Sequence, residues 1–372
     1  MSVKVAIIGC GGIGKNHANC YQNDALATLV AVCDIVPEKA KALGEAVNVP
    51  YFTSIREMLA ACPEIEAVSV TTSGYDNGSM HFEPAMEALD AGRHVLVEKP
   101  ICADLRDAQE LVRFAAQKKL YLGCNLNHYF TQTAKRADAL MADKKIGELV
   151  YCIHKVGFNG SEKSYGGPGT PRWQTPYSHV KAFCAHPFSV MRHFCGDIMQ
   201  VQAFMDKPGV RKSAADPMLS INSIHVRFAN GGVGYLLSQR GDAMFGLGGW
   251  WSYEHAGTRG TFCIENCVEK LHYWDIDGGK SGDAANPSMA GNAPEVFDTG
   301  IKDFNATFPS RIHAWLEDVT NKVPHEHIRA SGRDALATLT YTFAAMRSYE
   351  EGGALVIPEA LPALHGDVRY VW

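Results

Sequence analysis

The stretch from residue 3 to residue 14 constrains the fold of this chain most. Val3–Ile8 is a mostly apolar run, and a G-x-G-x-x-G loop, Gly-Cys-Gly-Gly-Ile-Gly, follows it at once. Such a loop between a strand and a helix is typical of Rossmann folds that bind dinucleotides, where the first glycine makes the turn, the second admits the pyrophosphate and the third allows close helix packing. We expect the cofactor phosphates to lie against the backbone of Gly9, Gly11, Gly12, Ile13 and Gly14.

The first 124 residues alternate apolar runs with stretches of helical spacing. The runs are 3–8, 29–34, 67–72, 94–97 and 121–124, and the helical stretches are 14–23, 37–45, 55–61, 82–91 and 105–118. Near-continuous apolar strands separated by helices favour a parallel sheet that is covered on both faces. The sequence therefore predicts an α/β fold whose N-terminal part, residues 1–124, is a doubly wound NAD-binding Rossmann domain.

The pattern changes after residue 124. Longer strands are expected at 148–155, 199–204, 220–228, 232–238 and 261–264, with helices at 134–143, 310–320 and 332–349. Several of these strands alternate apolar and polar residues, which indicates a sheet with one wetter face. Residues 125–372 are thus predicted to form a substrate-binding and oligomerisation α/β domain with a large open, mostly antiparallel sheet. Two glycine-rich loops, 157–170 and 278–300, are expected to interrupt it.

Composition excludes several classes of protein. The 372 residues are 46% hydrophobic and 20% charged, with a net charge of −5, so neither a nucleic-acid surface nor a membrane span is indicated. The 11 cysteines form no C-x-x-C pair, and Cys263, Cys267 and His272 have the wrong spacing for a zinc knuckle. The early apolar run ends at the glycine loop and is not expected to be a signal peptide. We therefore expect a cytoplasmic protein with reduced thiols and no metal.

Asp34 points to the identity of the dinucleotide. It ends the second predicted strand about 20 residues beyond Gly14, where an acidic residue hydrogen-bonds the adenosine ribose. A carboxylate there would repel a 2′-phosphate, and no arginine follows it in Ile35-Val36-Pro37. The sequence predicts NAD as the cofactor.

A second set of polar residues follows the strand at 94–97. Glu98, Lys99 and Pro100 come directly after it, at the carboxyl edge where ligands of open α/β sheets bind. The proline can place a cis peptide bond that turns the lysine inward.

With these residues the chain resembles the glucose–fructose oxidoreductase, inositol dehydrogenase and MocA-like group, the Gfo/Idh/MocA family. The likeness rests on the glycine loop, Asp34, the stretch from His81 to Val95, and Glu98-Lys99-Pro100. It continues through Gly147-Glu148-Leu149, 257–261 and the C-terminal helix, so it spans essentially the whole chain.

The resemblance implies roles for residues around the cofactor. Lys99 matches the lysine that hydrogen-bonds the reacting hydroxyl, and Glu98 matches a residue near the nicotinamide. The loop along the cofactor is matched by Thr71, Thr72 and His81. Asn125 and Asn127 follow the strand at 121–124 and are expected near the nicotinamide or the substrate.

The family usually carries Asp-x-x-x-His on a helix of the second domain that ends in glycine. Counting back from Gly196, the histidine falls on His186 and the aspartate position on Ala182. The histidine is kept and is interpreted as a general acid/base. The carboxylate is missing, and Lys181 or His179 is a candidate for its polar role.

The substrate pocket is expected to take residues from 165–177. Trp173 and Tyr177 can stack on a sugar face, Arg172 can pair with a carboxylate or carbonyl, and Tyr165 is expected to line the pocket. For each of them packing or loop anchoring is an equal alternative.

The resemblance implies an NAD-dependent oxidoreductase that moves hydride between nicotinamide and a ring hydroxyl or keto carbon of a sugar, polyol or sugar derivative, with Lys99 and His186 handling the proton. Because the aspartate is missing, an NAD-dependent glycoside hydrolase that oxidises transiently, eliminates and re-reduces stays open, as does a non-catalytic NAD sensor. We expect a homodimer or homotetramer paired through the second-domain sheet. The particular sugar is not readable from the sequence.

Overall fold

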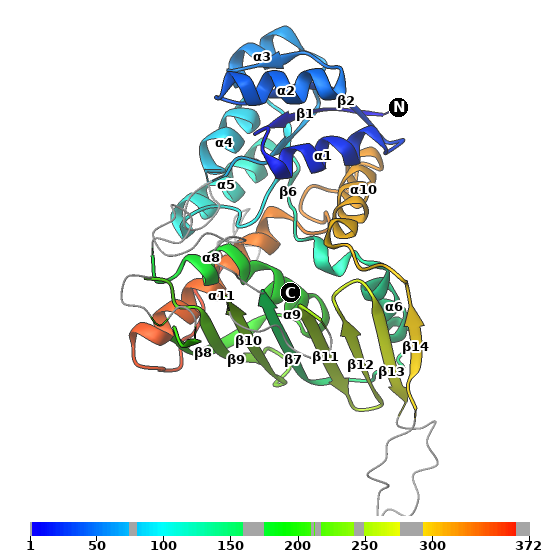
Figure 1. The fold of residues 1–372 in the computed structure, drawn as a ribbon, viewed down its shortest axis with the longest axis vertical. Helices are drawn as coiled ribbons and strands as arrows, with labels where there is room; N and C mark the ends of the chain where they lie inside the picture. The colour runs from blue at the N-terminus through cyan, green and yellow to red at the C-terminus, as the bar shows by residue number, and fades with distance from the viewer. Residues whose placement is uncertain are drawn as a thin grey trace, which may run out of the picture.

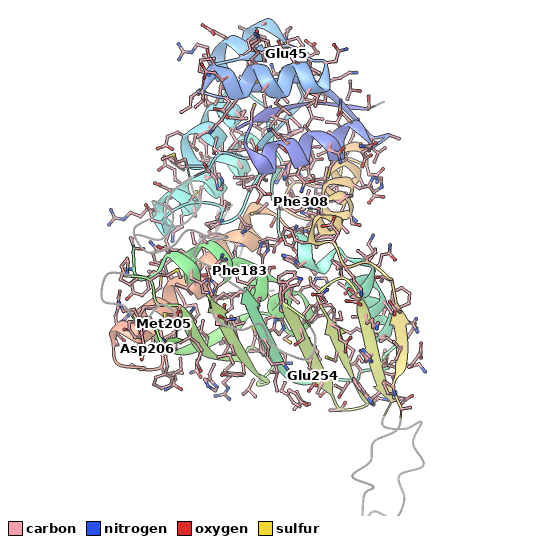
Figure 2. The ribbon with its side chains drawn as sticks, viewed as in Figure 1. Glu45, Phe183, Met205, Asp206, Glu254 and Phe308 are labelled. Carbon is pink, nitrogen blue, oxygen red and sulfur yellow. The ribbon has the colours of Figure 1, made fainter. Side chains whose placement is uncertain are left out.

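The computed structural model describes residues 2–73, 80–158, 175–209, 212, 217–241, 249–275 and 293–361. Its strands form two sheets at opposite ends of the molecule (Figure 1). Helices α8, α9 and α11 lie on the face of the larger sheet that is turned towards the N-terminal sheet (Figure 1). Phe183 and Phe308 lie in the layer between the sheets, and Glu45 lies at the far end of the N-terminal part (Figure 2).

The N-terminal sheet confirms the predicted Rossmann fold. Its six strands are all parallel, in the order β3-β2-β1-β4-β5-β6: β1 (Val3–Ile8), β2 (Ala27–Cys33), β3 (Tyr51–Phe52), β4 (Ala67–Val70), β5 (His94–Val97) and β6 (Leu122–Cys124). The helices are α1 (Gly12–Gln22), α2 (Pro37–Val47), α3 (Ile55–Ala61), α4 (Phe82–Asp90) and α5 (Leu105–Lys118). The strand order reverses between β1 and β4, which is where such sheets bind their ligands.

The second sheet has eight strands in the order β14-β13-β12-β11-β7-β10-β9-β8. They are β7 (Leu149–Phe158), β8 (Ile198–Asp206), β9 (Ile221–Phe228), β10 (Val233–Arg240), β11 (Trp251–Gly257), β12 (Gly260–Glu265), β13 (Lys270–Asp275) and β14 (Glu295–Asp298). Within the described strands of this second sheet, only β7 and β10 pair in parallel. Burial alternates along β8, β9 and β10, as expected for a sheet with one wetter face.

Four strands were not predicted: β3, β11, β13 and β14. One of them, β14, lies in a segment that was expected to be a loop. β14 lies inside the predicted loop 278–300, whose residues up to 292 are outside the described part of the chain. Of the other loop, residues 157 and 158 belong to β7 and the rest are not described. β3 spans two residues, too few for any periodicity to show. β13 carries aromatic residues on both faces, so polar alternation does not mark it. Along β11, Trp251, Tyr253 and His255 share one face and alternate with smaller or charged residues, a pattern that could have predicted the strand.

The remaining helices are α6 (Gln132–Ala142), α8 (Ser178–Phe183), α9 (Ala185–Cys195), α10 (Thr307–Thr320) and α11 (Gly332–Glu350), with short 3₁₀ turns at η1 (Asn127–Tyr129) and η3 (Phe304–Ala306). Within the described ranges no helix is long and apolar enough to cross a membrane.

Helix α10 packs on the N-terminal sheet although it comes late in the chain. Its side chains Phe308, Ile312 and Trp315 share one buried core with Val5 and Ile7 of β1. The predicted domain boundary at residue 124 stays a prediction. Helix α10 lies beyond that boundary in the sequence but covers part of the first sheet.

We predict that Trp315→Ala destabilises the protein by about 3–5 kcal/mol, the usual cost of deleting a buried aromatic side chain. Trp315 is fully buried and packs directly against Gly123 of β6. The measurement is urea unfolding followed by circular dichroism. His313→Ala on the exposed side of α10 is the control and should cost less than about 1 kcal/mol. Equal effects of the two substitutions would contradict this packing.

Candidate active site

The glycine loop has the geometry that its spacing predicts. Gly9 has φ +98°, and a Cβ there would lie 2.7 Å from the backbone carbon of Thr71. A Cβ at Gly14 would overlap the Gly9 carbonyl oxygen, so the helix can approach the strand only without one. No atom of the described residues lies within 4 Å of a Cβ built at Gly11 or Gly12. The start of α1 is thus open, as a phosphate-binding helix N-terminus must be.

Asp34 lies beside this loop, just past β2. Its carboxylate accepts hydrogen bonds from the backbone N–H of Cys10, at 2.7 Å, and of Val36, at 2.9 Å. These bonds hold the carboxylate between the glycine loop and the end of β2, where the ribose of a dinucleotide would lie. A second negative charge in this place would be repelled, which favours NAD over NADP.

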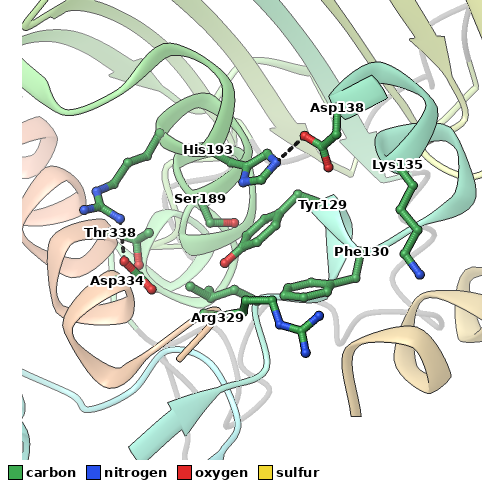
Figure 3. A pocket seen from close by; sticks show the side chains of 12 residues that line it. Tyr129, Phe130, Lys135, Asp138, Ser189, His193, Arg329, Asp334 and Thr338 are labelled. Carbon is green, nitrogen blue, oxygen red and sulfur yellow. Dashed lines mark hydrogen bonds and ion pairs between the residues drawn. The ribbon is translucent and has the colours of Figure 1, made fainter. Parts of the chain in front are cut away.

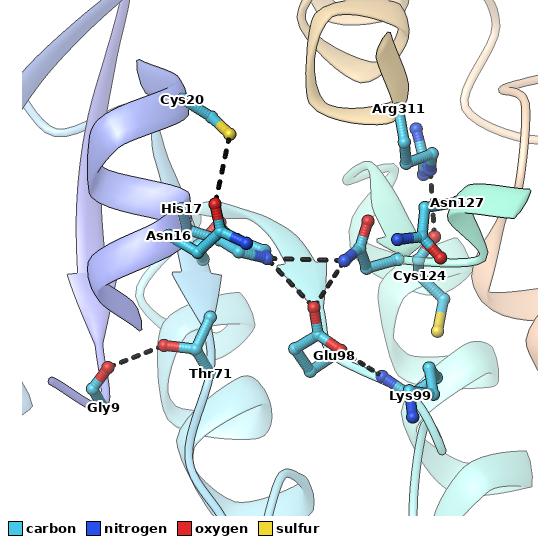
Figure 4. Close-up of polar contacts among 12 residues, drawn as sticks. Gly9, Asn16, His17, Cys20, Thr71, Glu98, Lys99, Cys124, Asn127 and Arg311 are labelled. Atoms are coloured by element: carbon cyan, nitrogen blue, oxygen red, sulfur yellow. Dashed lines mark hydrogen bonds and ion pairs between the residues drawn. The ribbon is translucent and has the colours of Figure 1, made fainter. Parts of the chain in front are cut away.

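A buried carboxylate, Glu98, joins the ends of β5 and β6 to helix α1 (Figure 4). It accepts hydrogen bonds from His17 Nε2, at 3.0 Å, and from Asn125 Nδ2. His17 Nδ1 contacts Ser69 Oγ of β4 at 3.2 Å. Burial raises the pKa of the Glu98 carboxyl, but His17, Lys99 and Asn125 outweigh that effect and hold the pKa below its usual value. Glu98 is therefore ionised in the core of the site.

Lys99 projects from the same turn towards the second sheet's helices. The Lys99–Pro100 peptide bond is cis, as the proline suggested. The Lys99 Nζ donates a hydrogen bond to the backbone oxygen of Ala182, at 3.1 Å. Burial lowers the pKa of this ammonium, Glu98 opposes the shift, and Arg240 adds to it. The position where the family carries aspartate thus still contacts Lys99, through its backbone carbonyl.

The helix expected to carry Ala182 and His186 is interrupted. α8 ends at Phe183, α9 begins at Ala185, and α9 ends before Gly196, as the glycine predicted. Pro187 in the first turn of α9 has no N–H, which leaves a carbonyl of the preceding turn without its usual donor. Ala182 and His186, which the resemblance places on one helix, therefore lie on two consecutive helices.

His186 and His128 form a buried pair near Lys99. Their rings meet edge to face, with centroids 4.2 Å apart. Burial lowers the pKa of His186 well below its ordinary value, and His128 and Lys99 lower it further. Burial likewise lowers the pKa of His128, with Lys99 adding to the shift. Both rings are neutral at pH 7.

His81 links two loops at the edge of the sheet. Its ring nitrogens contact the carbonyl oxygens of Pro100, at 2.7 Å, and Thr72, at 2.8 Å. Thr71 Oγ1 in turn donates to the Gly9 oxygen, at 2.7 Å. These contacts hold the turn at Lys99–Pro100, the segment after β4 and the glycine loop together.

Asn125 and Asn127 place two buried amide oxygens just past the end of β6. The Asn127 side chain donates to Thr307 Oγ1, at 2.7 Å. Both Oδ1 atoms are buried and have no hydrogen-bond partner in the described part of the structure. Unsatisfied buried acceptors are costly, so a donor such as a nicotinamide carboxamide fits this place. Together with the open glycine loop, they show that the site suits NAD.

The other residues predicted to be catalytic, His179 and Lys181, and the predicted substrate-binding residue Tyr177 make different contacts. His179 contacts Ser238 Oγ at 2.8 Å and accepts a bond from Arg240 Nε, at 3.2 Å. The Lys181 ammonium lies over the Phe343 ring of α11, 5.2 Å from its centroid. The Tyr177 hydroxyl donates to Glu350, at 2.7 Å. Tyr165, Arg172 and Trp173 lie outside the described residues.

Three residues of the site were not predicted from the sequence: His17, His128 and Arg240. His17 lies one turn after the glycine loop and His128 directly follows Asn127, so both spacings held a usable signal. Arg240 ends β10 and is buried. No local sequence pattern predicts that an arginine at the end of this strand is buried near the site.

A cavity of about 430 Å³ lies further along α9, where Ser189, Arg192 and His193 line it (Figure 3). It is lined by Tyr129, His193 and Asp334, among other residues, and by neither Lys99 nor His186. Arg192 beside it makes ion pairs of 2.6 Å with Asp197 and Asp334. This cavity is therefore separate from the candidate active site.

The sheet order, the open glycine loop and Asp34 define a Rossmann-type NAD-binding protein. Comparison with known proteins agrees. The family model described as "Oxidoreductase family, NAD-binding Rossmann fold" (Gfo/Idh/MocA) matches residues 3–126.

Inositol 2-dehydrogenase 2 of Mycolicibacterium vanbaalenii is 26% identical over 264 residues, which cover 66% of this chain and 73% of that protein. UDP-N-acetylglucosamine 3-dehydrogenase of Acidithiobacillus ferrooxidans is 33% identical over 120 residues, and this chain covers only 36% of its length. The crystal structure of levoglucosan dehydrogenase with NADH and levoglucosan has a TM-score of 0.80 at 17% identity, with 96% of this chain and 100% of that chain covered. At that identity the last likeness shows the fold alone. The N-terminal part of the chain thus resembles the NAD-binding domain of the Gfo/Idh/MocA oxidoreductases, and its cofactor is NAD.

We predict that Asp34→Ala weakens NAD binding by roughly 10- to 100-fold, because charged hydrogen bonds of about 1.5–3 kcal/mol are lost. The affinity for NADP should change less, since its 2′-phosphate is no longer repelled. Isothermal titration of both dinucleotides measures the two changes. A uniform loss for both would show that Asp34 only supports the loop.

We also predict that the free energy of unfolding falls as the pH is lowered from 7 to 5. His128 and His186 stay neutral in the folded protein, whereas in the unfolded chain they gain protons near pH 6.5. The unfolded state then binds more protons, so each residue lowers stability by up to about 1.4 kcal/mol per pH unit. Urea unfolding at several pH values should give a shallower slope for the His128→Gln/His186→Gln protein. Parallel slopes would rule out two neutral buried rings.

Proposed function

We propose that this enzyme transfers hydride between the nicotinamide of NAD and a ring hydroxyl or keto carbon of a sugar, polyol or sugar derivative. The observation that carries the proposal is the Lys99 ammonium, held at the carboxyl edge of the Rossmann sheet and bonded to Ala182 of α8. When bound, NAD supplies the hydride chemistry. The chain's own residues position the hydroxyl and handle its proton.

Lys99 is the better candidate for moving the proton. A general acid or base works best when its pKa lies near the working pH. Burial lowers the Lys99 pKa from above 10 towards neutrality, while it takes the His186 pKa further away from neutrality. In hydroxyl oxidation Lys99 Nζ, once neutral, accepts the proton. Neutral His186 then orients the hydroxyl by a hydrogen bond.

His179 and Lys181 fall outside this proton-handling pair in our proposal. His179 is held between Ser238 and Arg240, and Lys181 lies over Phe343. Arg240 adds positive charge beside Lys99, and it helps to keep the Lys99 pKa low. At the position of the family aspartate, the Ala182 carbonyl supplies only a hydrogen-bond acceptor for Lys99. Arg240 acts in the opposite electrostatic sense to a carboxylate, because its positive charge lowers the lysine pKa.

The relatives support a carbohydrate-like substrate. Their names specify inositol, UDP-N-acetylglucosamine and levoglucosan as substrates of those proteins. These relatives are dehydrogenases, so the glycoside hydrolase alternative is not favoured.

We further propose that copies of this chain associate through the uncovered face of the larger sheet. Ile153, Phe204 and Val233 alternate with the buried residues of their strands and therefore lie on the other face of the sheet. They are exposed by 37–55%. Exposed apolar residues gathered on one sheet face are typical of association surfaces.

We predict that Lys99→Met lowers kcat by about 10²- to 10⁴-fold, the usual contribution of a general acid or base. NAD affinity should change less than about threefold, because the glycine loop and Asp34 supply most of the binding. A screen of sugars and polyols with NAD⁺, followed by absorbance of NADH, measures the rate. Lys118→Met, an exposed lysine lying over Phe114, is the matched control. Full activity of the Lys99 variant would refute the assignment.

The pH dependence of the oxidation rate gives a separate test. Because only neutral Lys99 accepts a proton, kcat should rise with pH and level off below pH 10.5, the ordinary pKa of lysine. His186→Gln should reduce kcat without moving this rise. If the rise disappears in the His186 variant and persists in a residual-activity Lys99 variant, the two roles are reversed.

A further inference from the structure

Two strands at the centre of the large sheet bring thiol and imidazole groups together beneath the active site. Cys152 and His154 lie on β7, and His255 lies on the neighbouring β11 directly opposite Cys152. All three side chains are at most 1% exposed. They lie on the sheet face that is covered by α9, in a layer that includes Trp251, Phe194 and Phe262.

The three groups converge on one point. The Nε2 atoms of His154 and His255 are 3.0 Å apart, and one potential ligand atom of each of the three residues lies within 4.8 Å of the other two. Metal–nitrogen bonds of about 2.0 Å and metal–sulfur bonds of about 2.3 Å would separate such ligand atoms by roughly 3.3–3.8 Å. Small movements of the side chains would therefore suffice to enclose an ion.

We propose that Cys152, His154 and His255 form a buried binding site for one soft metal ion. A thiolate with two neutral imidazoles is the ligand set that soft d¹⁰ ions, Cu⁺ and Zn²⁺, prefer over Mg²⁺ or Ca²⁺. Unlike the exposed and widely spaced ligands of a surface site, these come from two paired strands and are preorganised by the sheet.

A fourth residue, Cys195 at the end of α9, contacts the cluster at the Cys152 thiol and at His255. Its Sγ lies 3.3 Å from His255 Nδ1, the ring nitrogen that faces away from His154. Ligating histidines usually give their second nitrogen such a partner, which orients the ring. The site would thereby tie α9, which carries His186, to the two central strands.

Charge balance distinguishes the two ions. In an apolar layer a neutral complex is favoured, because buried net charge is costly. Cu⁺ is neutralised by the single thiolate of Cys152, and Cys195 then stays an outer partner. Zn²⁺ needs a second thiolate, so Cys195 would have to rotate and become a ligand.

The test is the metal content of the purified protein. Wild type and the variants Cys152→Ser and His255→Gln are reconstituted with Zn²⁺, or with Cu⁺ under reducing conditions, desalted, and measured by mass spectrometry of the metals. We expect about one ion per chain in the wild type and less than about a tenth of that in each variant. Wild-type protein that holds neither ion, or variants that hold as much as wild type, would overturn the proposal.

A matched control and a further variant complete the experiment. Cys263 and His272 are paired on β12 and β13, outside the cluster, so Cys263→Ser/His272→Gln should keep the ion. Retention by Cys195→Ser supports the three-ligand site for Cu⁺, and loss of Zn²⁺ from that variant supports Cys195 as its fourth ligand. Far-UV circular dichroism and NAD binding establish that each variant is folded, and a metal-dependent rise in Tm reports the site independently of catalysis.

Discussion

The buried carboxylate of Glu98 is the interaction on which the rest of the site depends. It lies at the end of β5 and bonds His17 of α1 and Asn125 at the end of β6. An ionised carboxylate without these donors would cost several kcal/mol in the core. The helix that receives the phosphates and the strand ends that face the nicotinamide are therefore fixed relative to one another. Because Lys99 directly follows Glu98, the same contacts also fix the backbone from which the Lys99 side chain projects.

Residues from the second half of the chain, far from Lys99 in the sequence, complete the site. The Ala182 carbonyl receives the Lys99 ammonium, and His128 and His186 meet behind it. The break between α8 and α9 allows a backbone oxygen, rather than an aspartate, to contact the lysine. A carbonyl carries no full charge, so the Lys99 pKa stays lower here than a carboxylate neighbour would allow. This chain thus favours a lysine that can lose its proton.

Local signals predicted the first half of the fold well. The helices at 55–61 and 105–118 and the strands at 3–8 and 94–97 have the bounds that hydrophobic spacing gave. In contrast, the Glu98–His17 contact joins residues 81 positions apart, and no periodicity encodes such a contact. Strand β11 was missed although Trp251, Tyr253 and His255 alternate with smaller or charged residues along it. Pro187 was visible in the sequence and could have predicted the break before α9.

The most direct measurement is a crystal structure of the enzyme with NAD⁺ bound. We expect the pyrophosphate against Gly11 and Gly12, and the nicotinamide ring between Glu98 and Lys99. The carboxamide should donate to the free oxygen of Asn125 or Asn127, with room for one hydroxyl between Lys99 Nζ and His186. A nicotinamide bound elsewhere, or a Lys99 ammonium turned away from the ring, would contradict this account.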